Sequence, residues 1–158
     1  MLILVVLIVL SFSNFVASDC PKNSYTVPSN LGSNYNCVTV ETASISFVNA
    51  EVGCNNQSGH LVSVPNGYAN TFLADLAQIA VGTHDWCVWV GVSNIMGGIW
   101  KTVDDGNNIT FANWASGEPV NSSYPLCACI YDSGLWRTLY CHLTAQYLCA
   151  VPGSGETG

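Results

Sequence analysis

The sequence predicts an α+β domain with two helices, small antiparallel sheets and a long loop-rich middle. Apolar residues recur at helical spacing in two segments of the first half, around residues 47–54 and 72–80. The second half instead holds short β-branched and aromatic segments between clusters of Gly, Asn, Asp and Pro. Helices followed by strands, with no internal repeat, indicate one α+β domain rather than alternating strand and helix units.

Residues 1–18 are predicted to be a signal peptide. They carry no charge, and residues 1–10 are almost unbroken Leu, Ile and Val. This run falls short of the roughly 20 apolar residues that span a bilayer, and the small residues at Val16-Ala17-Ser18 suit cleavage. The alternative is an N-terminal membrane anchor, which would need flanking basic residues to set its orientation. We therefore expect a secreted, extracellular protein with no transmembrane segment in the mature chain.

The first helix follows an N-terminal extension and a short strand. Residues 19–36 are rich in Pro, Ser and Asn, which indicates an extension with turns, and residues 37–41 form a β-branched run typical of a strand. Ser46 can cap a helix that Gly59 would end. The apolar residues of this helix at helical spacing are Phe47, Ala50 and Cys54.

A second strand and a second helix come next. Residues 61–64 form an apolar strand that Pro65 closes. Asn66 can cap a helix that ends at Gly82. Its predicted buried face consists of Phe72, Leu73, Leu76, Ile79 and Ala80.

The rest of the chain is predicted to be strands and turns. A hairpin signal, Asp132-Ser133-Gly134, joins two of the strands. The tail at residues 152–158 is expected to be disordered. The predicted strands are residues 86–92, 127–131, 135–141 and 145–151.

Cysteine and glycosylation patterns agree with secretion. Eight cysteines, an even number, all follow the leader and indicate a disulfide framework in an oxidising compartment. Zinc binding is the alternative, but the chain has no C-x2-C pair, and Cys127 and Cys129 are spaced too closely. The chain also has three N-glycosylation sequons, which begin at Asn56, Asn108 and Asn121.

The charge balance excludes two classes of partner. Three basic residues stand against ten acidic ones, for a net charge of −7. Nucleic acids and anionic membranes are bound through clusters of Lys and Arg, and this chain has only Lys22, Lys101 and Arg137. The expected partner is therefore an extracellular glycan or protein ligand, and not a nucleic acid.

A series of motifs resembles the C-type lectin family. The resemblance covers roughly residues 20–151 and implies a C-type lectin-like domain at 37–151, with two helices flanking small antiparallel sheets and a long disulfide-clamped loop region. Defence against microbes is a common role among the secreted proteins that it resembles. The matching residues are Phe47-x2-Ala50-x3-Cys54, Gly59-His60-Leu61-Val62-Ser63, Trp89-Val90-Gly91-Val92, Trp100, Asp105-Gly106, Phe111-x-Asn113-Trp114, Gly117-Glu118-Pro119, Cys127, Trp136, Cys141 and Tyr147-Leu148-Cys149.

The resemblance also implies disulfide pairs. Two are the family's framework bridges, a third fits the N-terminal bridge of its longer members, and two cysteines then remain for the last. A bridge that closes a loop of about a hundred residues contributes about 4–5 kcal/mol on the chain-entropy model. In this order the pairs are Cys54–Cys149 and Cys127–Cys141, then Cys20–Cys37, then Cys87–Cys129.

The calcium ligands of sugar-binding family members are largely missing here. In such members three elements supply the oxygens that bind calcium. They are a Glu-Pro-Asn or Gln-Pro-Asp triplet, a Glu before the third framework Cys, and a Trp-Asn-Asp triplet. Here Val120 follows Glu118-Pro119, and Arg137-Thr138 follows Trp136. The position before Cys127 falls on Pro125 or Leu126, and the second calcium region at Asn94 and Gly98 lacks the required acids. Because calcium needs about six to eight oxygens, we expect no cofactor and no calcium.

Four residues of this region are the expected ligand-binding residues: Glu118, Asn121, Tyr124 and Arg137. Arg137 either pairs with Glu118 in the vacated cation space or points into solvent. Tyr124 either offers its ring to a ligand or packs against its own loop. A glycan on Asn121 would obstruct a shallow sugar site.

Catalysis is not expected. His60, His84 and His142 are scattered, and no catalytic signature motif is present. Asp104-Asp105 lies in a turn, where a solvated role is the expectation. Two binding functions remain: recognition of a carbohydrate or glycoconjugate without calcium, or binding of a protein or lipid surface with no sugar recognition.

Overall fold

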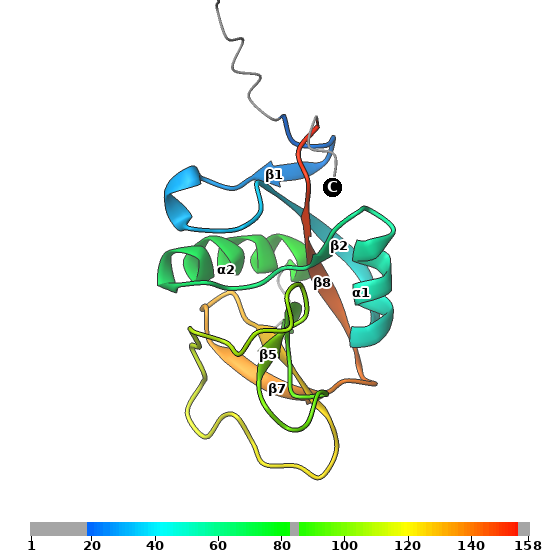
Figure 1. The fold of residues 1–158 in the computed structure, drawn as a ribbon, viewed down its shortest axis with the longest axis vertical. Helices are drawn as coiled ribbons and strands as arrows, with labels where there is room; N and C mark the ends of the chain where they lie inside the picture. The colour runs from blue at the N-terminus through cyan, green and yellow to red at the C-terminus, as the bar shows by residue number, and fades with distance from the viewer. Residues whose placement is uncertain (1–18, 83–85, 155–158) are drawn as a thin grey trace, which may run out of the picture.

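The computed structural model describes residues 19–82 and 86–154 of the chain (Figure 1). The predicted signal peptide at residues 1–18 lies outside the described residues. The elements are β1 (Ser24–Thr26), η1 (a 3-10 helix, Ser29–Leu31), β2 (Cys37–Ser46), α1 (Phe47–Asn55), β3 (His60–Leu61), α2 (Gly67–Val81), β4 (Val88–Ser93), β5 (Lys101–Thr102), β6 (Leu126–Ile130), β7 (Trp136–Tyr140) and β8 (Thr144–Val151).

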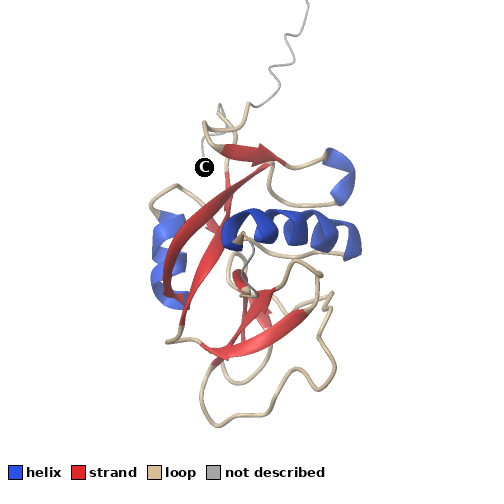
Figure 2. Ribbon diagram, turned by 180° about the vertical axis from the view of Figure 1, so that it is seen from behind, coloured by secondary structure: helices blue, strands red, loops and turns tan. Residues whose placement is uncertain are grey.

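The strands form one mixed sheet in the order β1-β2-β8-β4-β6-β7, with β3 attached to β8 and β5 to β4. The predicted small antiparallel sheets are joined because β4 and β8 pair in parallel at Trp89 and Tyr147. The other pairs of strands are antiparallel. Figures 1 and 2 show α2 crossing the sheet near β2 and β8, with α1 alongside the same two strands. The predicted α+β class is confirmed.

Helix α1 begins where predicted and ends early. Ser46 occupies the N-cap position, and the buried residues are the three apolar ones predicted from helical spacing. The helix ends at Asn55, before Gly59. A Cβ on Gly59 would lie 2.0 Å from the carbonyl oxygen of Ala150, so this glycine allows β8 to approach closely rather than ending the helix.

Helix α2 matches its predicted limits. The Asn66 side chain accepts hydrogen bonds from the backbone N–H groups of Tyr68 and Ala69, both at 3.0 Å, which satisfies two donors that the helix start leaves free. Gly82 follows the last helical residue. One predicted core residue is wrong: Ile79 is 52% exposed, because its position on the helix lies outside the arc that faces the sheet.

The predicted strands differ from the observed ones mainly in length, and the short strands β1 and β5 were not predicted. Strand β2 extends to Ser46 because it pairs with β8 along most of its length, through a register shift between Glu41 and Ile45. Strand β3 contains only two residues. Residues 155–158 of the tail that was predicted to be disordered lie outside the described residues. Its residues 152–154 are placed, and Ser154 bonds to the backbone oxygen of Asp19 through its N–H, at 2.7 Å, and its hydroxyl, at 2.6 Å.

Four disulfides brace the sheet, and no cysteine is free. The bridges with the longest and the shortest sequence separations span 95 and 14 residues. All four bridges match the expected pairs: three are implied by the family resemblance, and the fourth joins the two cysteines that remain. The pairs are Cys20–Cys37, Cys54–Cys149, Cys87–Cys129 and Cys127–Cys141.

Candidate functional site

The long loop between β5 and β6 is held against the outer edge of β7. The Trp136 N–H donates to the carbonyl of Asn113 at 2.8 Å, and the Ala115 N–H donates to the carbonyl of Trp136 at 2.9 Å. The Trp114 ring packs between Trp100 and Trp136, with centroid distances of 4.9 and 5.4 Å. These contacts bring the following loop residues, including Glu118, beside β7.

The Glu118 carboxylate is surrounded by hydrogen-bond donors from its own chain. Its Oε2 accepts from the Thr138 hydroxyl at 2.5 Å and from the Thr138 N–H at 3.2 Å. The Val120 N–H donates to the same oxygen at 3.2 Å. Glu118 is half-buried and Thr138 is 9% exposed. The carboxylate therefore ties the loop to β7.

Arg137 does not pair with Glu118. Among residues 19–82 and 86–154 the one ion pair joins Glu51 and His60. The Arg137 guanidinium instead lies 5.0 Å from the centroid of the Tyr131 ring. Successive residues of a strand point to opposite faces, so Thr138 faces the loop and Arg137 is exposed on the other face. The pairing hypothesis is wrong, and the exposed alternative holds.

Tyr124, in the long loop, contacts Tyr140 at the end of β7. Its side chain is 69% exposed, and its ring meets that of Tyr140 edge-on, with centroids 6.3 Å apart. Tyr140 is 43% exposed and stacks on His142 at 5.7 Å with an interplanar angle of 14°. Asn121 is exposed, as are the other sequon residues Asn56 and Asn108.

A mostly apolar groove of about 470 Å³ begins at these rings. Tyr140 and His142 were not predicted as site residues. The only sequence signal for them is an aromatic residue and a histidine two positions apart at the end of a strand. The groove is lined by Ser46, Val48, Ile95, Tyr124, Pro125, Cys141 and His142.

Comparison with known proteins identifies the family. The family model described as the Lectin C-type domain matches residues 43–151. The chain belongs to the C-type lectin family. Regenerating islet-derived protein 3-gamma of Mus musculus is 31% identical over 84% of this chain and 76% of that protein. Lithostathine of Rattus norvegicus is 30% identical over 83% of this chain and 82% of that protein.

A solved structure agrees with this C-type lectin assignment. Human lithostathine superposes with a TM-score of 0.70 at 26% identity and covers 85% of this chain and all of its own. This C-type lectin chain therefore has the predicted C-type lectin-like fold. The described residues contain no helix that is both long enough and apolar enough to cross a membrane.

Asn94 and Gly98, at the position expected for the family's second calcium site, have structural roles in this C-type lectin. The Asn94 side-chain oxygen accepts a hydrogen bond from the Leu126 N–H at 2.7 Å, and the Asn94 N–H donates to the Leu126 carbonyl at 3.0 Å. Gly98 has a left-handed φ of 77° in the following turn. Asn94 therefore joins the end of β4 to the start of β6.

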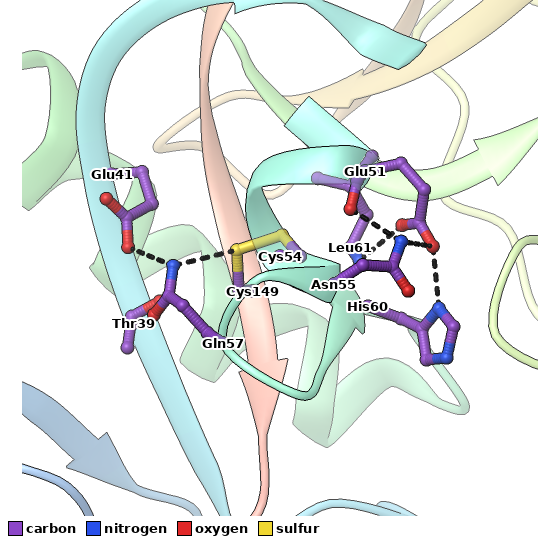
Figure 3. The surroundings of a disulfide bond; sticks show 9 residues. All are labelled: Thr39, Glu41, Glu51, Cys54, Asn55, Gln57, His60, Leu61 and Cys149. Carbon is purple, nitrogen blue, oxygen red and sulfur yellow. Dashed lines mark hydrogen bonds and ion pairs between the residues drawn. A yellow bond between two sulfur atoms is a disulfide. The ribbon is translucent and has the colours of Figure 1, made fainter. Parts of the chain in front are cut away.

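His60 and His142, the histidines among the described residues, have different surroundings. His60 Nδ1 lies 2.6 Å from Glu51 Oε1, and Glu51 Oε2 accepts from the Leu61 N–H at 2.8 Å, beside the Cys54–Cys149 bridge (Figure 3). His142 borders the groove, and His84 lies outside the described residues. Within residues 19–82 and 86–154, no group of three or more His, Cys, Asp or Glu side chains could hold a metal ion.

The acidic turn of this C-type lectin is organised by local hydrogen bonds. The Thr102 hydroxyl donates to Asp105, and Asn107 donates its backbone N–H at 2.9 Å and its amide at 2.8 Å. These bonds, that of Thr102 first, lower the pKa of the exposed Asp105 carboxyl. Asp105 is therefore ionised at neutral pH, and its hydrogen bonds to Thr102 and Asn107 stabilise the turn.

Proposed function

We propose that this C-type lectin is an extracellular binding protein that recognises a carbohydrate or glycoconjugate without calcium. The observation that carries the proposal is the set of three donors on Glu118 Oε2, from Val120 and Thr138. A calcium ion is held by lone pairs on about six to eight oxygens, whereas N–H and O–H groups present positive hydrogen atoms. These donors stabilise the Glu118 carboxylate, and the two N–H groups offer a cation no lone pair.

The neighbouring residues do not complete a calcium shell either. Val120 and Leu126 have hydrocarbon side chains, and Arg137 carries a positive charge. A calcium ion at Glu118 would therefore still lack most of its oxygen ligands. The residues present therefore do not fit the ion.

Similar proteins support binding as the activity of this fold. The solved mouse scavenger receptor C-type lectin domain, with a TM-score of 0.71 and 21% identity, is titled a carbohydrate-recognition domain. A solved calcium-independent type II antifreeze protein has a TM-score of 0.68 at 22% identity. Four disulfides suit an oxidising, extracellular setting. These likenesses support the proposal and do not name a sugar.

Adding calcium should leave the melting temperature unchanged. A site filled at a hundred times its Kd would add about 2.7 kcal/mol, which raises Tm by roughly 5 °C or more in a domain of this size. Thermal melts with calcium and with a chelator measure the shift, and a glycan array run both ways measures binding. We expect array binding that persists in chelator. A calcium-dependent rise in Tm, or binding lost in chelator, contradicts the proposal.

Replacing Glu118 by alanine should destabilise the protein whether or not calcium is present. The change removes the acceptor of the Thr138 N–H and leaves the Val120 N–H only its longer bond, at 3.5 Å, to the Thr138 hydroxyl oxygen. Hydrogen bonds to a charged group contribute about 1.5–3 kcal/mol, and partial exposure reduces this to about 1–2 kcal/mol. Chemical denaturation with calcium and with chelator measures the loss. A loss seen only with calcium would mean that Glu118 is a metal ligand.

One observation favours the second function, binding of a protein surface. A neighbouring hollow of about 370 Å³ shares Val48 and Ile95 with the groove, and the adjoining Met96 is 71% exposed. Exposed apolar patches of this kind often mark protein interaction sites. An array with no bound glycan, together with a folded protein, would favour this second function over the first.

A further inference from the structure

Three exposed rings form a continuous strip beside the loop that carries Glu118. The strip consists of Tyr124, Tyr140 and His142, with centroids 6.3 and 5.7 Å apart along it. The rings come from the long loop, the end of β7 and the turn before β8. Separate segments of the chain thus bring three exposed aromatic rings together, with Tyr140 and His142 nearly parallel and Tyr124 nearly perpendicular to Tyr140.

The backbone beneath the strip is firmly held. Residues 138 and 140 are two apart on β7, so Tyr140 continues along the face on which Thr138 meets Glu118. The turn after β7 is closed by a hydrogen bond from the Leu143 N–H to the Tyr140 carbonyl at 2.9 Å. Cys141 is bonded to Cys127, and its carbonyl accepts from the Phe47 N–H at 3.1 Å.

The loop end of the strip is anchored as well. The Tyr124 N–H donates to the Ser122 hydroxyl at 2.9 Å. Two residues beyond Tyr124, Leu126 is bonded to Asn94 in both directions. A ligand therefore meets rings whose backbone is already ordered, which lowers the entropy cost of binding.

We propose that this strip and the adjoining groove bind a neutral glycan chain through the faces of its sugar rings. The face of an aromatic ring carries negative charge density, which attracts the polarised C–H groups on one face of a pyranose. Three neighbouring rings at different angles can contact more than one sugar of a chain. The His142 imidazole and the Ser46 hydroxyl supply hydrogen bonds at the edges. This site rests on the proposed function and names its ligand class.

Charge selects a neutral ligand. The groove lining includes no Asp, Glu, Lys or Arg, whereas the whole chain carries a net charge of −7. A sulfated or sialylated glycan would be repelled by the protein as a whole and would find no cation in the groove. The volume of about 470 Å³ lies within the range of roughly 300–1,000 Å³ typical of small-ligand sites.

The test compares ring removal inside and outside the strip. Tyr124→Ala and Tyr140→Ala should each weaken binding of neutral oligosaccharides by about five- to tenfold, the loss expected for one ring contact. Tyr124→Phe and Tyr140→Phe keep the rings and should bind within about twofold of the parent chain. Tyr68→Ala is the matched control, because Tyr68 is 78% exposed on α2 and lies outside the strip.

The probes are neutral oligosaccharides of glucose, mannose and N-acetylglucosamine, with a sulfated oligosaccharide for comparison. Calorimetry measures their binding both with calcium and with chelator. Thermal melts check that each variant folds. Equal binding by the alanine variants and Tyr68→Ala, preference for the sulfated probe, or no binding of any neutral probe overturns the site. Binding lost only when calcium is removed would contradict the proposed function, whereas chelator-resistant binding insensitive to the strip contradicts this site alone.

Discussion

Replacing Cys54 and Cys149 together by alanine should lower the free energy of unfolding by about 4–5 kcal/mol. The bridge joins residues 95 positions apart, so its removal restores a large loop entropy to the unfolded chain. For a loop of about a hundred residues the chain-entropy model gives about 4.7 kcal/mol. A typical domain is stable by only about 5–15 kcal/mol, so this bridge supplies a large share of the stability.

The folded state adds to the loss. Both cysteines are fully buried, and Cys149 lies in β8, paired with Thr39 of β2 and Leu61 of β3. The bridge fastens α1 to this strand, with the bonds of Gln57 on one side and those of Glu51 on the other (Figure 3). Two alanines leave an unfilled space among these elements.

The matched control is the Cys20–Cys37 bridge, which spans 17 residues at the end of the sheet. On the same model its removal costs about 3 kcal/mol. Denaturant unfolding under non-reducing conditions measures both double variants against the parent chain. Equal losses, or a larger loss for the Cys20–Cys37 variant, would show that loop length does not determine the stabilisation here.

Much of the fold was predictable because the decisive signals are local. Asn66 and Gly82 mark the ends of α2 through cap chemistry that operates within one helical turn. Gly59 was misassigned because its role depends on the approach of Ala150, about ninety residues away. Ile79 was misassigned because helical spacing alone does not say how wide an arc the sheet covers.

The site was less predictable, because it depends on which face each strand residue takes. Arg137 and Thr138 are adjacent in sequence, yet only Thr138 bonds to Glu118. A shift of the strand register by one residue would move each side chain to the opposite face of the sheet. Tyr124 was predicted as a ligand residue from its place in the loop. Tyr140 and His142 were missed because the fold, and not their spacing, brings them to Tyr124.

Replacing Trp136 by alanine should cost about 3–5 kcal/mol, the usual range for a buried tryptophan. The side chain is fully buried. The rings of Phe111 and Trp114 meet it edge-on, with centroids 5.9 and 5.4 Å away, and its Nε1–H donates to Asn70 Oδ1 at 2.6 Å. Because this packing holds the long loop to the sheet, chemical denaturation should show a lower midpoint and limited proteolysis should show earlier cleavage in the loop. Wild-type stability in this variant would contradict the prediction.

A second pair of variants separates the hydrogen bond from the cavity. Trp136→Phe removes the donor but keeps a ring, and it leaves Asn70, which is 4% exposed, with an unpaired oxygen that costs about 1–3 kcal/mol. Adding Asn70→Leu removes that oxygen. Gly134 keeps a partner in the double variant, because its carbonyl also accepts from the Asn113 amide at 2.7 Å. Neighbouring substitutions couple through the contact that they share. If the unpaired oxygen causes the loss, the double variant is more stable than Trp136→Phe alone. If the double variant is no more stable, the loss comes from packing.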